Sequence, residues 1–148
     1  MSDCVSKKDL YEKAAGLHAG GLTCSEAVMK GILEGLGRPV DDALYNMASP
    51  FSGGAMSGEL CGVLSGAALA AAVLLPDWGK QPNRAKALTK RLVKEFREKE
   101  SCVRCEDLTR ERGKGTPEQT AQCRRMVGET AAHAGALIAR TLGMEVTD

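Results

Sequence analysis

Aromatic residues are scarce in this chain and make up only 3% of its 148 residues. Because β-strands favour aromatic and β-branched side chains, a fold built mainly from sheets matches this composition poorly. The apolar fraction is nevertheless 43%, so the core has to come from Leu, Val, Ala, Met and Gly, which pack closely between helices. We therefore expect an all-α fold, a compact helical bundle that forms a single domain over residues 1–148.

The chain also lacks a long uninterrupted apolar stretch. Its longest apolar run, from Leu60 to Leu75, contains Gly and Ser and is shorter than the roughly 20 residues that cross a bilayer. The first residues contain no apolar segment typical of a secretory signal. We therefore expect a cytoplasmic protein without membrane insertion. In that reducing compartment, cysteines are more often metal-binding or catalytic than structural.

There is no excess of charge of either sign, since 20 Lys and Arg residues stand against 19 Asp and Glu residues and leave a net charge of +1. Binding to a nucleic acid depends on neutralising several phosphates with a basic surface. We therefore exclude nucleic acid as the main partner.

Helix start and stop signals are frequent along the chain. Ser6 with Asp9 resembles a capping box, and Thr23 with Glu26 forms a clearer one. Thr116 precedes a proline in the first helical position, which is a strong start signal. We expect about five to seven helices, with residues 1–5 frayed. The helices that these signals predict cover, approximately, residues 6–18, 23–36, 41–47, 60–75, 83–100 and 116–142.

The predicted helix over 60–75 is apolar nearly all round, so it should be a buried, Gly- and Ala-rich central helix. Its small residues suit either the core or a homodimer interface, and the pattern does not separate the two. A glycine-rich segment, 49–58, precedes it. This segment matches neither of the usual phosphate-binding glycine patterns, so we expect a tight backbone path there.

The most informative residues are six cysteines. Cys24 and Cys61 fall in the first turns of predicted helices, where unpaired N–H groups and a partial positive charge favour a thiolate. Thiolates ligate metals and attack disulfides, so we expect these two cysteines to ionise easily. Cys102 and Cys105 follow a helix end, and Cys123 lies about two turns into the last helix. Cysteine also packs as a small hydrophobe, which is the simplest alternative.

The two histidines and Cys4 are less informative about function. His18 and His133 lie far from the cysteines in sequence, and we interpret them as helix-surface or core residues rather than ligands. Cys4 lies in the terminus that we expect to be frayed, so we assign it no role.

Several motifs together resemble a known family, the C_GCAxxG_C_C redox-active proteins with four invariant cysteines. In chain order they are Thr23-Cys24-Ser25-Glu26-Ala27, Phe51-Ser52-Gly53-Gly54, Cys61-Gly62-Val63-Leu64-Ser65-Gly66, Cys105-Glu106-Asp107-Leu108-Thr109 and Cys123. A similar domain forms part of split-Soret cytochromes. The resemblance covers about residues 20–140. Val63 departs from the alanine of the family signature, and Cys102 is an additional cysteine.

The resemblance implies a redox site built from Cys24, Cys61, Cys105 and Cys123. We favour Cys105 over Cys102 because Leu108-Thr109 follow it as in the family pattern. The split-Soret relatives suggest that these cysteines bind an iron–sulfur cluster, and four thiolates suit a [2Fe–2S] cluster, a [4Fe–4S] cluster or another thiophilic metal. The protein would then be an electron carrier or oxidoreductase that serves an unidentified redox partner protein.

Two other functions remain open from the sequence. The first is a metal-free thiol–disulfide oxidoreductase or redox sensor, in which Cys102 and Cys105 form a disulfide, or in which Cys24 or Cys61 attacks one. The second is a structural helical protein whose cysteines only fill the core.

Overall fold

The computed structural model describes residues 3–39, 41–80, 82–110, 112–113 and 115–148. Within these ranges the chain is 70% helical, with seven α-helices and a short two-stranded parallel sheet. The predicted compact all-α fold is therefore confirmed. The helices are α1 (Lys7–Ala19), α2 (Cys24–Gly35), α3 (Asp42–Asn46), α4 (Gly62–Leu74), α5 (Arg84–Glu100), α6 (Cys105–Thr109) and α7 (Pro117–Thr141).

The predicted caps begin the helices that were assigned to them. The Ser6 hydroxyl accepts a hydrogen bond from the backbone N–H of Asp9 at the start of α1. Thr23 and Glu26 form a complete capping box at the start of α2, with each side chain bonded to the other's backbone. At the start of α7, the Thr116 hydroxyl accepts a hydrogen bond from the backbone N–H of Gln119. Local side-chain chemistry therefore fixes where these helices start.

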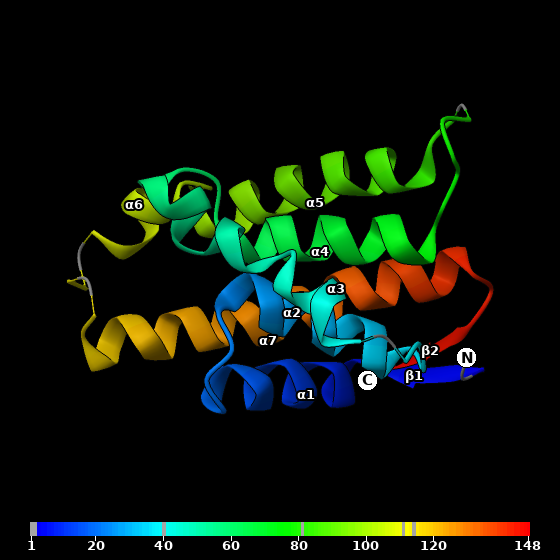
Figure 1. The fold of residues 1–148 in the computed structure, drawn as a ribbon, viewed down its shortest axis with the longest axis horizontal. Helices are drawn as coiled ribbons and strands as arrows, with labels where there is room; N and C mark the ends of the chain where they lie inside the picture. Colours follow the sequence, from blue (N-terminus) through cyan, green and yellow to red (C-terminus); the bar gives the residue numbers. More distant parts are fainter. Residues whose placement is uncertain (1–2, 40, 81, 111, 114) are drawn as a thin grey trace.

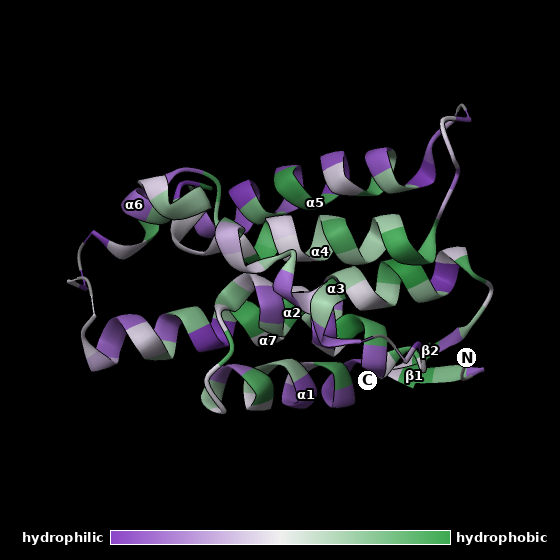
Figure 2. Ribbon diagram, in the orientation of Figure 1, coloured by the Kyte–Doolittle hydropathy of each residue, from purple (hydrophilic) through white to green (hydrophobic). Residues whose placement is uncertain are grey.

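The long helix α7 runs along the bundle and packs against α1, α2, α4 and α5 (Figure 1). The helix α4 lies between α2, α5 and α7, and most of its residues are buried. Figure 2 shows the resulting pattern, because α4 is apolar over most of its surface whereas α5 alternates polar and apolar residues. The predicted Gly- and Ala-rich central helix is therefore the helix α4.

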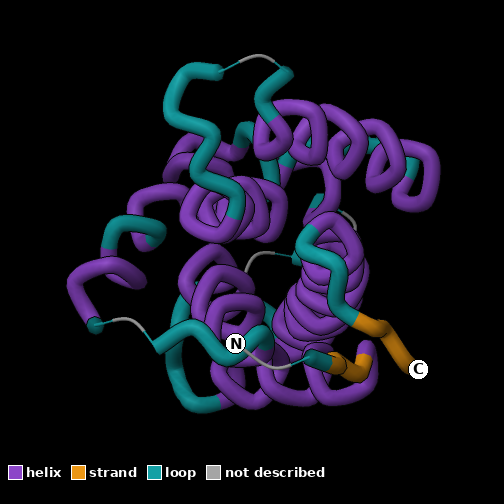
Figure 3. Tube along the Cα trace, turned by 90° about the vertical axis from the view of Figure 1, so that its right-hand side faces the viewer, coloured by secondary structure: helices purple, strands orange, loops and turns teal. Residues whose placement is uncertain are grey.

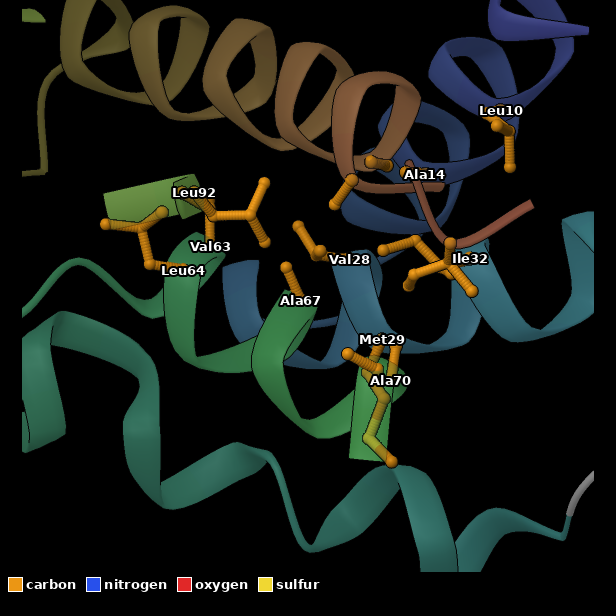
Figure 4. Packing of buried hydrophobic residues seen from close by; sticks show 14 of the residues in the cluster. Leu10, Ala14, Val28, Met29, Ile32, Val63, Leu64, Ala67, Ala70 and Leu92 are labelled. Carbon is orange, nitrogen blue, oxygen red and sulfur yellow. The ribbon is translucent and has the colours of Figure 1, made fainter. Parts of the chain in front are cut away.

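The small residues of α4 let it approach α2 closely. A Cβ atom added at Gly66 would collide with the Ser25 backbone, whose Cα would lie 3.1 Å away. Figure 4 shows Ala67 and Ala70 of α4 facing Val28 and Met29 of α2 in the same cluster. The small-residue face of α4 thus packs within the chain itself, against α2, rather than standing open for a second copy.

The two ends of the chain meet in a small sheet. Strand β1 (Cys4–Ser6) pairs in parallel with β2 (Glu145–Thr147), and Val5 is buried between them and the core. Figure 3 shows the two strands side by side near the C-terminus. The expectation of a frayed terminus is therefore wrong for Cys4 and Val5, because the strand pairing and the burial of Val5 hold them; residues 1 and 2 lie outside the described part.

Among the helices of the described residues, none combines the length and apolar character that a membrane span requires.

Candidate cysteine site

Cys24 is the first residue of α2, directly after the Thr23 cap. Its sulfur lies against the start of α4, because a Cβ atom at Gly62 would stand 2.7 Å from Cys24 Sγ. The same added atom would meet the carbonyl oxygen of Phe51 at 3.0 Å. Glycine at position 62 therefore provides the space in which the Cys24 thiol and the glycine-rich segment meet α4.

Cys61 and Cys105 are brought together by a short antiparallel bridge. Leu60 pairs with Arg104 in this bridge. The Cys61 N–H donates to the carbonyl of Val103 at 2.8 Å, and the Cys105 N–H donates to the carbonyl of Glu59 at 2.6 Å. These two bonds hold the two cysteine backbones side by side, although the two residues are 44 positions apart in the sequence.

The short helix α6, which begins with Cys105, is anchored at its other end. Leu108 is buried, and the Thr109 hydroxyl donates to the Cys105 carbonyl at 2.9 Å. The Gln122 side chain of α7 donates from Nε2 to the Leu108 carbonyl at 2.9 Å. Since Cys123 is the next residue of α7, this bond ties the segment of Cys105 to the segment of Cys123.

The glycine-rich segment turns back sharply above this site. After the short helical turn η1 (Ser49–Phe51), residues Gly53 to Met56 have φ between +58° and +66°, and Gly58 has φ of +73°. These values belong to the left-handed region, which is costly for Ala55 and Met56. In Figure 1 this turn, η2 (Gly54–Gly58), and α6 lie together at the left end of the bundle. The predicted tight backbone path is therefore present.

The four predicted cysteines affect one another's ionisation. The pKa of the buried Cys61 thiol is raised, mainly by burial and further by the charges of Cys24, Cys105 and Cys123. The pKa of Cys123 is raised to about 11 by burial and by the charges of Cys24 and Cys105. The pKa of Cys24 is also raised, by burial first and then by Cys105. Every pair among the four is thus close enough to interact electrostatically.

The expectation that Cys24 and Cys61 ionise easily is wrong. Backbone N–H groups of Gly53 and Ser25 do lower the pKa of Cys24, and that of Val63 lowers the pKa of Cys61. Burial outweighs them, because removing a thiolate from water disfavours the charged form. The helix-terminus effect is therefore present, but it is the smaller of the two.

The other cysteines lie apart from this group. The Cys102 thiol points toward the end of α5 and donates to the Glu100 carbonyl, with Sγ and O 3.8 Å apart. Cys4 lies on β1 opposite Glu145. This placement supports Cys105 rather than Cys102 as the third cysteine of the site. All six cysteines lie among the described residues, and the structure records no disulfide between Cys102 and Cys105.

The histidines are held elsewhere. His133 contacts Glu95 at 3.2 Å, and His18 accepts from Arg124 at 3.3 Å, both through helix-surface side chains. This agrees with their interpretation as structural residues. In the described ranges, no three His, Cys, Asp or Glu side chains are placed so that they could hold a metal ion.

Sequence reasoning missed Gln122 as a residue of this region. Its side chain is only 8% exposed, and its Oε1 atom has no hydrogen-bond partner among the described residues. A buried acceptor without a partner is unfavourable by about 1–3 kcal/mol, which is unusual in a well-packed core. The only signal in the sequence was a glutamine directly before Cys123 on the inner face of a predicted helix.

The fold and this arrangement define a helical protein with four interacting cysteines at one end of the bundle. A family model described as "Putative redox-active protein (C_GCAxxG_C_C)" matches residues 22–137. The chain belongs to this family of redox-active proteins, as its motifs predict. No curated protein and no solved structure matches the chain.

Proposed function

We propose that Cys24, Cys61, Cys105 and Cys123 together bind an iron–sulfur cluster or another thiophilic metal, and that the protein transfers electrons. The observation that carries this proposal is the mutual interaction of the four thiols, which come from four separate segments of the chain. Packing alone does not require four distant segments to bring the same residue type to one place.

The four sulfur donors are of the type that such a group prefers. Sulfur is the preferred ligand of iron–sulfur clusters and of other soft metals. The raised pKa values of Cys24, Cys61 and Cys123 show that several thiolates are unfavourable in this environment without a compensating positive charge. A bound metal would supply that charge and displace the protons.

The chain's own residues would tune the bound group. Backbone N–H groups of Gly53 and Val63 donate to the sulfurs of Cys24 and Cys61, and hydrogen bonds to ligating sulfur raise the reduction potential of a cluster. When bound, the group would accept and release single electrons. The partner in this exchange would be another redox protein, and we place the reaction in the cytoplasm, where thiols stay reduced.

The direct test is purification without air, followed by a visible spectrum and by quantification of iron and sulfide. We expect a coloured protein with iron and sulfide in stoichiometric amounts. A protein that stays colourless and free of iron after anaerobic reconstitution would contradict the proposal.

The metal-free alternative is less well supported by the same observations. Attack on a disulfide requires a thiolate, and the pKa values of Cys24, Cys61 and Cys123 are raised rather than lowered. Titration of thiols before and after mild oxidation distinguishes the two functions. A reversible loss of two thiols in iron-free protein would favour the oxidoreductase.

A further inference from the structure

A cavity of about 510 Å³ lies between α5 and α7, over the start of α4. Its volume is within the range of roughly 300–1,000 Å³ that is usual for ligand sites. The helices α5 and α7 both pack on α4 and touch each other little, which leaves the space between them. Leu64 and Met126, which line the cavity, follow Cys61 and Cys123 by three residues in the sequence. The cavity therefore begins about one helical turn from two cysteines of the candidate site.

The floor of this cavity is apolar. Four buried side chains from three helices form it: Leu64 of α4, Leu92 and Phe96 of α5, and Met126 of α7. Figure 4 shows Leu64 and Leu92 next to each other in the core cluster. Phe96 supplies an aromatic ring and Met126 a polarisable sulfur, and both groups favour contact with another aromatic ring.

One polar side chain, that of Thr130 on α7, lies among these apolar ones. Thr130 lines the cavity and is only 7% exposed. The hydroxyls of Thr89, Thr120 and Thr141 donate to the carbonyl four residues earlier in their helices, whereas the Thr130 hydroxyl has no partner among the described residues. It is not one of the unpartnered polar atoms that are sealed from solvent, so a molecule in the cavity can reach it.

The charged side chains at the mouth of the cavity already have partners. Three side-chain pairs join α5 to α7 there: Glu95 with His133, Lys99 with Glu129, and Glu100 with Arg125. Glu98, the remaining charged residue of the mouth, pairs with Lys94 of its own helix. A charged ligand would have to displace one of these partners, whereas an uncharged ligand can enter without that cost.

We infer that this cavity binds an uncharged, hydroxylated aromatic molecule. The aromatic ring packs on Phe96 and Met126, and the ligand hydroxyl forms a hydrogen bond with Thr130 Oγ1. Binding involves no covalent or redox step and requires neither a metal nor a change in any cysteine, so it goes beyond the proposed function. The position of Leu64 and Met126 places the bound molecule beside the candidate site.

The probe for this test is 2-naphthol, which carries one hydroxyl on an aromatic ring and, like other phenols, is uncharged at neutral pH. The purified chain, labelled with ¹³C at its methionine methyl groups, is titrated with it. We expect the Met126 methyl signal to shift and to saturate. Met29 is buried but does not line this cavity, so its signal reports any general change of the core. Met56 is 76% exposed and reports nonspecific binding at the surface.

Thr130→Val tests the hydrogen bond, because it removes the hydroxyl and keeps a side chain of similar shape. It should weaken the binding of 2-naphthol about three- to tenfold and leave the binding of naphthalene, which has no hydroxyl, unchanged. Thr141→Val is the matched control, since Thr141 lies on the same helix and its hydroxyl is bonded to the Leu137 carbonyl at 2.8 Å. It should leave the binding of both molecules unchanged.

A charged probe with the same ring, 2-naphthoate, tests the selection for uncharged ligands. It should bind the wild-type protein at least about tenfold more weakly than 2-naphthol, because its charge finds no unpaired partner at the mouth. Glu129→Gln removes a partner of Lys99 and should narrow this difference.

Three results would overturn the inference: an unmoved Met126 signal, a shift of Met126 together with Met29 and Met56, or equal affinity of the wild-type protein and Thr130→Val for 2-naphthol. Preference for 2-naphthol that is absent in the wild-type protein, or unchanged in Glu129→Gln, would overturn the uncharged ligand class. None of these measurements depends on iron or sulfide content, so this inference and the proposed function can fail separately.

Discussion

The helical framework and the cysteine end of the molecule differ in how their backbones are held. In the framework, formed by α1, α2, α4, α5 and α7, four of the five helices begin at a side-chain cap and continue as regular helices. At the cysteine end, formed by residues 47–61 and 101–109, the elements are short and the backbone repeatedly enters the left-handed region.

The same division holds for exposed apolar side chains. Of the five large exposed hydrophobic residues in the described part, four lie in the cysteine end: Met47, Phe51, Met56 and Leu60. Strained backbone and exposed apolar groups both lower stability, so they persist where function requires them. The comparison teaches that the framework is optimised for folding, and that the cysteine end is held in place by it.

The largest expected effect comes from removing single cysteines of the candidate site, two of which lie in the cysteine end and two on the framework helices α2 and α7. If the four thiols share one bound group, changing Cys24, Cys61, Cys105 or Cys123 to Ser should each lower its occupancy at least tenfold, because a hydroxyl is a poor ligand for a soft metal. Iron and sulfide content after anaerobic purification measures the effect.

Cys4→Ser and Cys102→Ser are the matched controls and should keep the occupancy of the wild-type protein. Loss of the group in Cys102→Ser with retention in Cys105→Ser would show that the third ligand had been assigned wrongly. Equal behaviour of all six variants, with only stability affected, would instead favour cysteines that merely pack in the core.

A single methyl group added at Gly66 should destabilise the framework. Gly66→Ala forces α4 away from the Ser25 backbone, which cannot move as a flexible side chain would. We expect a loss of about 3 kcal/mol in the free energy of unfolding, at the upper end of overpacking effects. Denaturant titration of the metal-free protein measures it.

Gly16→Ala is the control for this substitution. Nothing lies within 4 Å of a Cβ atom at that position in α1, so the change should stabilise the helix by about 0.5–1 kcal/mol. If Gly66→Ala and Gly16→Ala changed the free energy of unfolding in the same direction, the close approach of α2 and α4 would not depend on Gly66.

The candidate site should also respond to alkaline pH when no metal is bound. The pKa of Cys123 rises from 9.0 to about 11 in the folded protein, so folding favours the protonated thiol. The protonated Cys123 thiol therefore contributes to the free energy of unfolding. This contribution is fully present below about pH 9 and is lost as the pH rises to about 11.

We expect the free energy of unfolding to fall by at most about 2 kcal/mol over this pH range, since part of the Cys123 side chain remains in contact with solvent. Cys123→Ser should remove this part of the pH dependence, whereas Cys4→Ser should retain it. A stability profile between pH 8 and pH 11 that is identical in both variants would contradict the assignment.

The same division explains what the sequence could predict. Each long helix was predicted because its signal is local, as with Thr23 and Glu26 within three residues of each other. The helix α6 was missed because Arg104 provides no side-chain cap. The strands were missed because three residues at each end of the chain pair only with each other.

The candidate site shows the same limit. The residue types and their order predicted the four cysteines that the fold brings together, and the Leu108-Thr109 pattern indicated Cys105. Their ionisation was predicted wrongly, because the helix-terminus effect is visible in the sequence whereas burial depends on tertiary packing. Gln122 was missed for the same reason, since its partner at Leu108 lies on another element.

The smallest expected effect tests the comparison with one substitution made in both regions. Ala55 is exposed in the turn η2 and has a φ of +58°, where glycine avoids the steric cost of a Cβ atom. Ala55→Gly should therefore stabilise the protein by about 0.5–1 kcal/mol, even after the greater entropy of glycine in the unfolded chain. Ala87 is exposed and is the fourth residue of α5, and Ala87→Gly should destabilise the protein by up to about 1 kcal/mol. Thermal unfolding of both variants measures the difference. If Ala55→Gly destabilises the protein as Ala87→Gly does, the left-handed turn is not strained. The conformation of the turn would then give no reason to connect it with the function of the cysteines.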